Sequence, residues 1–231
     1  MPDFPSFEKA IGVQFKDRGL LTQAFIHRSY INENPNTGLF HNERFEFLGD
    51  AVLELAITKF LFDKYPNVTE GELTSYRSSL VNAVIISEVA SELGMNNYLP
   101  LSKGEQKDNG KARQYILANT YEAVVGAIYL DQGYEVAAQF ILKTLAGRID
   151  EIVKKKLWRD AKSYIQEMAQ EHYSLTPVYK VMKETGPDHD KQFTVGIFFG
   201  SEHIASGKGK SKQEAETSAA EGALEKKGWR E

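Results

Sequence analysis

Apolar residues recur at helical spacing through most of residues 7–150, which predicts an α-helical region. The clearest helix covers 50–66, and Pro66 marks its end because proline cannot continue the hydrogen-bond ladder. The stretch 70–94 keeps the same spacing and predicts a second long helix. Gly94 stands where a helix commonly closes with one left-handed residue.

A polar, glycine-bearing segment at 102–113 interrupts this pattern and predicts a loop. Residues 115–133 are apolar on nearly every side, so we expect that helix to lie at the centre of its domain. A last amphipathic helix is predicted over 137–156. This part of the chain is therefore expected to be all-α.

The pattern changes after about Arg159. Asp160 is a suitable N-cap for a short helix over 161–172. Three β-type runs with turn residues between them come next, at 178–184, 192–199 and 203–207. An Ala-rich helix over 212–227 completes an α-β-β-β-α order, in a segment long enough to fold alone. The chain is predicted to be an α+β multidomain protein with a boundary between about 150 and 160.

The amino-acid composition narrows the possible chemistry. The 231 residues include no Cys, which excludes disulfides, thiolate zinc sites, iron–sulfur clusters and cysteine nucleophiles. Residues 1–16 interleave charges with apolar positions, unlike a signal peptide. No uncharged stretch approaches the roughly 18 residues that a membrane helix needs, so a cytoplasmic protein without membrane contact is expected.

The net charge, taken at face value, argues against a nucleic-acid-binding protein. Lys and Arg number 28 against 32 Asp and Glu, which gives a charge of −4 at pH 7 and a pI near 5.8. Nucleic-acid-binding domains are usually basic. The distribution of the charges therefore has to decide the question.

Three carboxylates share one face of a predicted helix at 41–50. Glu43, Glu46 and Asp50 stand at i, i+3 and i+7, where like charges repel one another. Taken alone, these acids also fit a solvated surface. Apolar neighbours such as Val52 place part of this face near a core, and carboxylates forced together there call for a cation. Oxygen ligands without Cys favour Mg²⁺ or Mn²⁺.

A polar pair, Asn119 and Glu122 at i and i+3, interrupts the most apolar predicted helix. A buried Glu must be paired, protonated or metal-bound, because an isolated buried charge is very costly. A structural ion pair with an arginine such as Arg77 or Arg113 is the alternative to a metal ion. Glu70 is either a further carboxylate of the same site or an ordinary acid at a helix start.

Three segments resemble the signature stretches of the ribonuclease III family; they are residues 42–50 (NERFEFLGD), 70–82 and 117–131. The C-terminal part resembles a double-stranded-RNA-binding domain at 163–167, 186–190, 193–195 and 207–212, together with Ala215. Both matches keep the domain order and together span nearly the whole chain.

The resemblance implies an all-α RNase III nuclease domain over 4–150, with its signature core at about 4–133. An α-β-β-β-α double-stranded-RNA-binding domain over 160–229 would follow it. The resemblance further implies a homodimer that cleaves double-stranded RNA with Mg²⁺, or with Mn²⁺ as a substitute, and leaves 5′-phosphate and 3′-hydroxyl ends. Processing of rRNA precursors, mRNA and tRNA is the role that it implies.

By position, the resemblance implies that Asp50 and Glu122 are the catalytic residues. The implied metal ligands are Glu46, Asn119 and Glu122, and the accessory acids are Glu43 and Glu70. Bacterial members usually carry Asp where this chain has Asn119, so weaker metal binding is expected. The alternative is a regulator that binds double-stranded RNA and whose nuclease centre is impaired.

The C-terminal part distributes its charges unevenly. Residues 160–231 hold 10 Lys and Arg against 12 Asp and Glu. Lys208, Lys210 and Lys212 nevertheless fall together, with no acid between them, where a helix is predicted to begin and to attract phosphate. A solvated Lys-rich loop is the alternative for this cluster alone. The resemblance implies that the RNA-binding residues are Ser163, Gln166, Glu167, Gln170, His189, Lys208, Lys210, Ser211 and Lys212.

Overall fold

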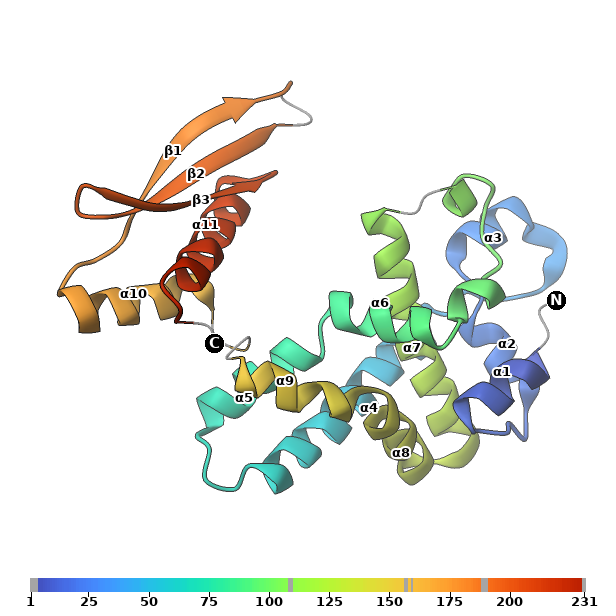
Figure 1. Cartoon of the computed structure of the whole chain (residues 1–231). Coiled ribbons are helices and arrows are strands. Elements are labelled where there is room, and N and C mark those ends of the chain that lie inside the picture. The colour runs from blue at the N-terminus through green and yellow to red at the C-terminus, as the bar shows by residue number, and fades with distance from the viewer. Residues whose placement is uncertain (1–3, 108–109, 156–157, 159, 188–190, 230–231) are drawn as a thin grey trace. The chain divides into compact units, whose positions relative to one another are not determined.

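A computed structural model of the chain describes residues 4–107, 110–155, 158, 160–187 and 191–229 (Figure 1). It separates into two compact units, Met1–Ile152 and Val153–Glu231, each with a hydrophobic core of its own. Among the described residues, no helix combines the length and the apolar character needed to cross a membrane.

The described part of the first unit is helical (Figure 1). Its α-helices are α1 (Phe4–Ile11), α2 (Arg18–Ala24), α3 (Arg28–Glu33), α4 (Glu43–Lys64), α5 (Glu70–Leu80), α6 (Ala83–Glu92), α7 (Lys111–Gln132), α8 (Tyr134–Leu145) and α9 (Ile149–Lys154). Short 3₁₀ turns lie at η1 (Pro35–Thr37), η2 (Met95–Tyr98), η3 (Glu105–Lys107) and η4 (Ala146–Arg148). The all-α prediction is confirmed, and α7 is buried along much of its length, as its apolar sequence predicts.

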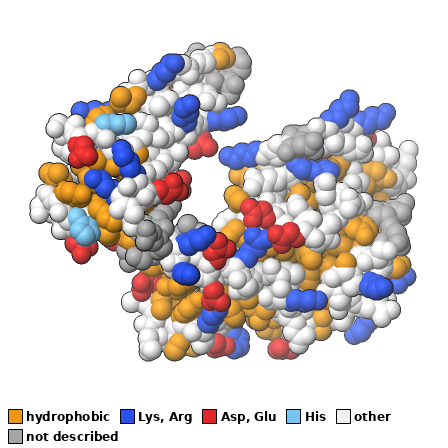
Figure 2. Space-filling model, in the orientation of Figure 1, with side chains coloured by type: hydrophobic (Ala, Val, Ile, Leu, Met, Phe, Trp, Pro, Cys, Tyr) orange, Lys and Arg blue, Asp and Glu red, His pale blue; other side chains and the backbone are white. Residues whose placement is uncertain are grey.

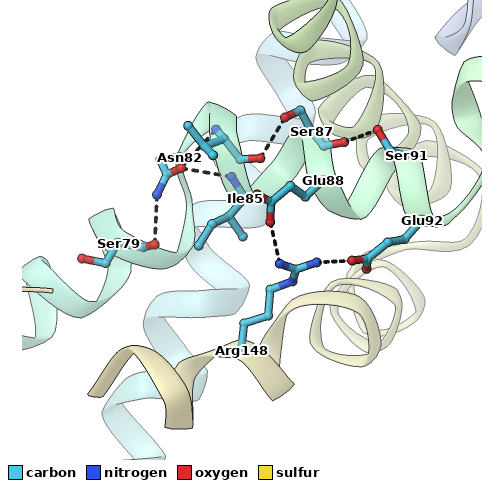
Figure 3. A network of polar contacts seen from close by, with 9 residues as sticks. Ser79, Asn82, Ile85, Ser87, Glu88, Ser91, Glu92 and Arg148 are labelled. Atoms are coloured by element: carbon cyan, nitrogen blue, oxygen red, sulfur yellow. Dashed lines mark hydrogen bonds and ion pairs between the residues drawn. The ribbon is translucent and has the colours of Figure 1, made fainter. Parts of the chain in front are cut away.

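The single helix predicted over 70–94 is wrong, because the chain breaks after Val81 into α5 and α6. Asn82 causes the break by capping α6: its side-chain oxygen accepts hydrogen bonds from the backbone N–H groups of Val84 and Ile85, both at 3.1 Å. Its amide group donates back to the carbonyl oxygen of Ser79 at 2.9 Å (Figure 3). The predicted ending at Gly94 is confirmed, with φ +70°.

Other helix limits also differ from the pattern-based prediction. Helix α4 joins the helix predicted at 41–50 to the one predicted at 50–66, so the acidic segment lies on the same helix as the apolar stretch after it. Helix α7 begins at Lys111, inside the predicted loop. The helix predicted over 137–156 is interrupted by η4, which separates α8 from α9.

A pair of glycines sets the packing of α4 against α7. A Cβ added at Gly49 would overlap the carbonyl oxygen of Glu122, and one added at Gly126 would overlap the carbonyl oxygen of Phe45. The two backbones therefore approach each other more closely than any side chain at these positions would allow. This approach places the first turns of α4 directly beside the middle of α7.

Arg148 holds α6 against the turn that follows α8 (Figure 3). Its guanidinium donates to Glu88 at 2.8 Å and to Glu92 at 2.6 Å, two acids one helical turn apart on α6. The forked guanidinium matches two carboxylates at this spacing. Because α6 also packs on α7, this contact braces the central helix from outside.

The second unit has the predicted α-β-β-β-α order: α10 (Ala161–Tyr173), β1 (Val178–Thr185), β2 (Gln192–Phe199), β3 (Glu202–Gly209) and α11 (Lys212–Lys226). The strands form one antiparallel sheet in the order β1-β2-β3. Both helices pack on one face of this sheet, where Ile165, Ile197, Ile204 and Leu224 are buried together. No described helix or strand of this unit covers the opposite face of the sheet. Asp160 caps α10 as predicted, accepting from the N–H of Ser163 at 2.8 Å.

We predict that Gly126→Ala lowers the free energy of unfolding by about 1–3 kcal/mol or more, because the added methyl group forces α4 and α7 apart. Urea unfolding followed by circular dichroism measures the change. Gly71→Ala is the matched control, since Gly71 also lies in a helix but has nothing within 4 Å of its added Cβ. It should cost nothing, or stabilise the protein slightly. Equal stabilities for the two variants would contradict the close approach.

Candidate active site and RNA-binding surface

The acidic segment is helical, as predicted, and Asn42 anchors its start. The Asn42 side chain is buried and donates to the carbonyl oxygen of Ala24 at 2.9 Å, while its backbone N–H donates to Ile26 at the same distance. Glu43 and Glu46 therefore occupy the first turn of α4, where the helix dipole favours negative charge.

Glu43 has basic neighbours of its own. The Arg28 guanidinium lies 3.2 Å from one carboxylate oxygen of Glu43, and the His41 ring nitrogen lies 3.5 Å from the other. These contacts come from α3 and from the residues just before α4. They set Glu43 apart from the other acids of this helix face, in keeping with an accessory position.

Glu46 meets α7 through Asn119. The Asn119 side chain lies close to Glu46 across the crossing of the two helices and favours the charged form of its carboxylate. Burial, followed by the charges of Glu43 and Asp50, raises the pKa of Glu46, and the polar side chain of Asn119 opposes that increase. An amide at position 119 thus still favours the charged form of Glu46.

Glu122 is the most perturbed acid of the group. Its side chain is mostly buried, and burial, then the nearby charges of Asp50 and Glu46, raises its pKa to about 8. The arginine alternative is wrong: the Arg77 guanidinium pairs with Glu54 at 3.0 Å. The other candidate arginine, Arg113, donates to the side chain of Asn96 at 2.8 Å.

The crossing therefore brings together four oxygen-bearing side chains: Glu46, Asp50, Asn119 and Glu122. Carboxylate and amide oxygens are the donors that Mg²⁺ and Mn²⁺ prefer, and a divalent cation would relieve the repulsion that raises the pKa of Glu122. In the part of the chain that the structure describes, no three His, Asp or Glu side chains are already grouped tightly enough to hold a metal ion. The chemistry of these donors fits a divalent ion.

Glu70 is not joined to this group by any interaction among the described residues. It lies in the first turn of α5 and accepts a hydrogen bond from the Thr74 hydroxyl at 3.2 Å. Its side chain lines a cleft between α4 and α5 together with Phe62 and Arg77. The role of Glu70 as an accessory acid stays a prediction.

The predicted RNA-contacting residues of α10 lie together on its outer side. Ser163, Gln166, Glu167 and Gln170 follow i, i+3, i+4 and i+7 spacing, and all four are exposed. A shallow pocket joins Ser163 and Gln166 to Gln213 and Thr217 of α11, a neighbourhood that the sequence did not reveal. The remaining predicted contact, His189, lies outside the described residues.

The lysine cluster lies at the start of α11, as predicted. Ser211 caps this helix by accepting from the N–H of Glu214 at 3.1 Å, and Lys208, Lys210 and Lys212 are exposed around it. Sequence reasoning missed Glu214, whose carboxylate accepts from the backbone N–H of Lys210 at 2.8 Å. This acid offsets part of the positive charge of the cluster, and its i+3 position after the capping Ser is the signal that could have revealed it.

Comparison with known proteins agrees with this architecture. The family described as Ribonuclease-III-like matches residues 17–149, and the Double-stranded RNA binding motif matches 161–227. Ribonuclease 3 of Pelotomaculum thermopropionicum is 44% identical over 216 residues, which cover 94% of this chain and 90% of that protein. The chain belongs to the ribonuclease III family. Ribonuclease 3 of Bdellovibrio bacteriovorus is 43% identical over 223 residues, covering 96% and 95% of the two chains.

Solved structures of this ribonuclease III family agree with the helical unit. The nuclease domain of ribonuclease III from Campylobacter jejuni is similar with a TM-score of 0.57 and 34% identity, covering 65% of this chain and 96% of that one. A second structure of that domain, described as showing flexibility in a region involved in dimer formation, has a TM-score of 0.55 at the same identity and covers 62% and 98%. The protein is accordingly a double-stranded-RNA-specific endoribonuclease from a family of metal-dependent nucleases.

Without metal, Glu122 is predicted to make the free energy of unfolding fall as pH rises. The folded protein keeps the Glu122 proton up to about pH 8, whereas the unfolded chain releases it near the ordinary value of 4.5. Between these values the folded state binds more protons, so its stability falls by up to about 1.4 kcal/mol per pH unit. Glu122→Gln should remove this dependence. Urea unfolding in EDTA at several pH values measures it.

The control for this experiment is Glu225→Gln, which removes an exposed acid near the end of α11. It should leave the pH dependence of the free energy of unfolding as it is in the parent chain. Identical pH slopes for Glu122→Gln and the parent would show that Glu122 does not hold the proton.

Proposed function

We propose that this chain is a Mg²⁺-dependent homodimeric endoribonuclease that cuts double-stranded RNA to 5′-phosphate and 3′-hydroxyl ends, with a nuclease domain over 4–150 and an RNA-binding domain over 160–229. Precursors of rRNA and other structured transcripts are the proposed substrates. The observation that carries the proposal is the juxtaposition of Glu46, Asp50 and Glu122 at the α4–α7 crossing, where the charge of Asp50 contributes to raising the pKa of both Glu46 and Glu122.

In this proposal Glu46, Asn119 and Glu122 hold the metal ion. When bound, Mg²⁺ supplies positive charge that neutralises the scissile phosphate and lowers the pKa of a water molecule. Glu122 must give up its proton before its carboxylate can serve as a ligand, so metal binding is linked to proton release near neutral pH. Asp50 is exposed beside this group and is free to orient the attacking water or to exchange a proton with it.

Asn119 lowers the affinity of the site for the metal ion but does not abolish metal binding. Its side-chain oxygen can still ligate an ion, but it brings no negative charge. Since the Asn119 side chain favours the charged form of Glu46 and each of the other acids is present, the alternative of an impaired RNA-binding regulator is not favoured.

The exposed apolar residues of α4 support the homodimer. Phe47 is 80% exposed, Leu55 57% and Phe62 69%, and all three side chains fall on one side of the helix. Hydrophobic side chains reach the surface of this unit in broad areas (Figure 2). Large exposed apolar surfaces mark contact sites, and two copies would supply one acidic centre for each RNA strand.

Cleavage of a long RNA duplex tests this function directly. With Mg²⁺ the chain should release shorter duplexes with 5′-phosphate ends, and with EDTA it should release none. Glu122→Gln keeps the shape of the side chain but removes the carboxylate, so the rate should fall by about 10²–10³-fold or more. Gel electrophoresis of end-labelled duplex measures both. Cleavage that persists in EDTA would reject the metal assignment.

Asn119→Asp is predicted to lower the metal requirement, because the added charge strengthens the ion's attachment. The parent chain should need a higher Mg²⁺ concentration for half-maximal cleavage, and extra Mg²⁺ or Mn²⁺ should increase its rate more than that of Asn119→Asp. Metal titrations of the two proteins provide the comparison. Superimposable curves would remove Asn119 from the set of metal ligands.

Lys212→Gln is predicted to weaken duplex binding and to reduce the slope of log K against log salt by about 1, the contribution of one phosphate contact. Binding of a short blunt duplex in EDTA, measured by fluorescence anisotropy at several salt concentrations, gives the slope. Lys227→Gln, which changes a lysine just after the other end of α11, is the control and should keep the parent slope. An unchanged slope for Lys212→Gln would count against the assignment.

A further inference from the structure

The uncovered face of the sheet in the second unit is basic. Strand pairing places Lys180 beside Gly196, and Lys183 beside Thr194, on the face opposite the helices. The same register turns Val195 and Ile197 toward the helices, where they are buried. The described parts of the three strands put no Asp or Glu on the uncovered face, although the C-terminal part of the chain as a whole is acidic. Positive charge is therefore segregated onto this face.

Aromatic rings lie at the centre of this basic face. The Phe198 and His203 rings are neighbours across β2 and β3, with centroids 5.1 Å apart. Both rings lie against Gly196: an added Cβ there would come within 3.0 Å of Phe198 and 3.2 Å of His203. The ammonium group of Lys180 sits 5.0 Å from the centre of the Phe198 ring. Because Gly196 in the middle strand has no side chain, the two rings can lie against the backbone of the sheet, with the Lys180 ammonium group next to the Phe198 ring.

The His203 ring is held in place from its own strand. A hydrogen bond of 2.8 Å joins its Nε2 to the hydroxyl of Ser206, which the register places on the same face. A β-bulge at Ile204 makes this possible, because Ile204 and Ala205 both turn toward the helices. The His203 ring is not part of the hydrophobic core of this unit. Its fixed position on the uncovered face suits a contact with a ligand outside the domain.

We propose that this face, made by Lys180, Lys183, Phe198, His203 and Ser206, binds single-stranded RNA. Unstacked bases can lie on flat aromatic rings while lysines contact the phosphates, and sheets with aromatic residues on one face bind single strands in this way. A duplex does not fit this role, because its bases are stacked on each other. Among the described strand residues, this face has no acid to repel phosphate.

Continuity with the duplex-binding surface supports this ligand over an acidic peptide. Lys208 pairs with Thr194 and so lies at the border between the uncovered face and the lysine cluster before α11. A single-stranded tail of a duplex held by that cluster would therefore leave it toward Lys183 and Phe198. An acidic peptide would use the lysines but gain little from the rings.

Fluorescence anisotropy of the full chain with a labelled 12-nucleotide oligouridylate, in EDTA to prevent cleavage, tests the proposal. The parent should bind it. Phe198→Leu, which keeps an apolar side chain but removes the ring, should weaken binding about fivefold or more. The double variant Lys180→Gln, Lys183→Gln should reduce the slope of log K against log salt by about 1.4, the value for two single-strand phosphate contacts.

Blunt-duplex binding and the thermal unfolding midpoint should stay at parental values in these sheet variants, which separates loss of the site from misfolding. Lys212→Gln is the reverse control and should weaken the duplex complex alone. No binding of the single strand by the parent, or equal binding by parent and sheet variants, would overturn the proposal. Displacement of the oligouridylate by polyglutamate as readily as by unlabelled RNA would assign the face to acidic peptides instead.

Discussion

The contact on which the active-site arrangement depends is the backbone approach of α4 and α7 at Gly49 and Gly126. Neither helix can move away without separating the acids of α4 from Glu122, and neither can carry a larger residue at the crossing. The packing of α4 on α7 at this point therefore also fixes the positions of the acidic residues. The Asn42 anchor and the Arg148 brace support the same two helices from their flanks.

This arrangement is electrostatically unfavourable on its own. Asp50 and Glu46 add to burial in keeping a proton on Glu122. Folding therefore brings these carboxylates into a position where their negative charges repel one another. Strong perturbation by burial together with neighbouring charges is typical of functional sites. The net charge of −4 is therefore a misleading guide to ligands, because part of it lies where a divalent cation would turn an acidic patch into a phosphate-binding one.

Helical periodicity predicted most elements correctly, and its errors have local causes. The spacing of apolar residues is the same on both sides of Asn82, so periodicity alone predicts one helix over 70–94. The break depends on the Asn82 side chain, which satisfies the first N–H groups of α6 and competes with continuation of α5. The interruption at η4 and the early start of α7 likewise depend on contacts that a local pattern does not contain.

The sequence alone determined the type and order of the elements, the face shared by Glu43, Glu46 and Asp50, and the resemblance to ribonuclease III, because each rests on local spacing or on residue identity. Tertiary structure decided which groups meet. It gave Glu122 carboxylates as neighbours instead of Arg77 or Arg113, and it placed Lys180 beside Phe198 from separate strands. Such contacts follow from helix approach and strand register, which involve residues far apart in the chain.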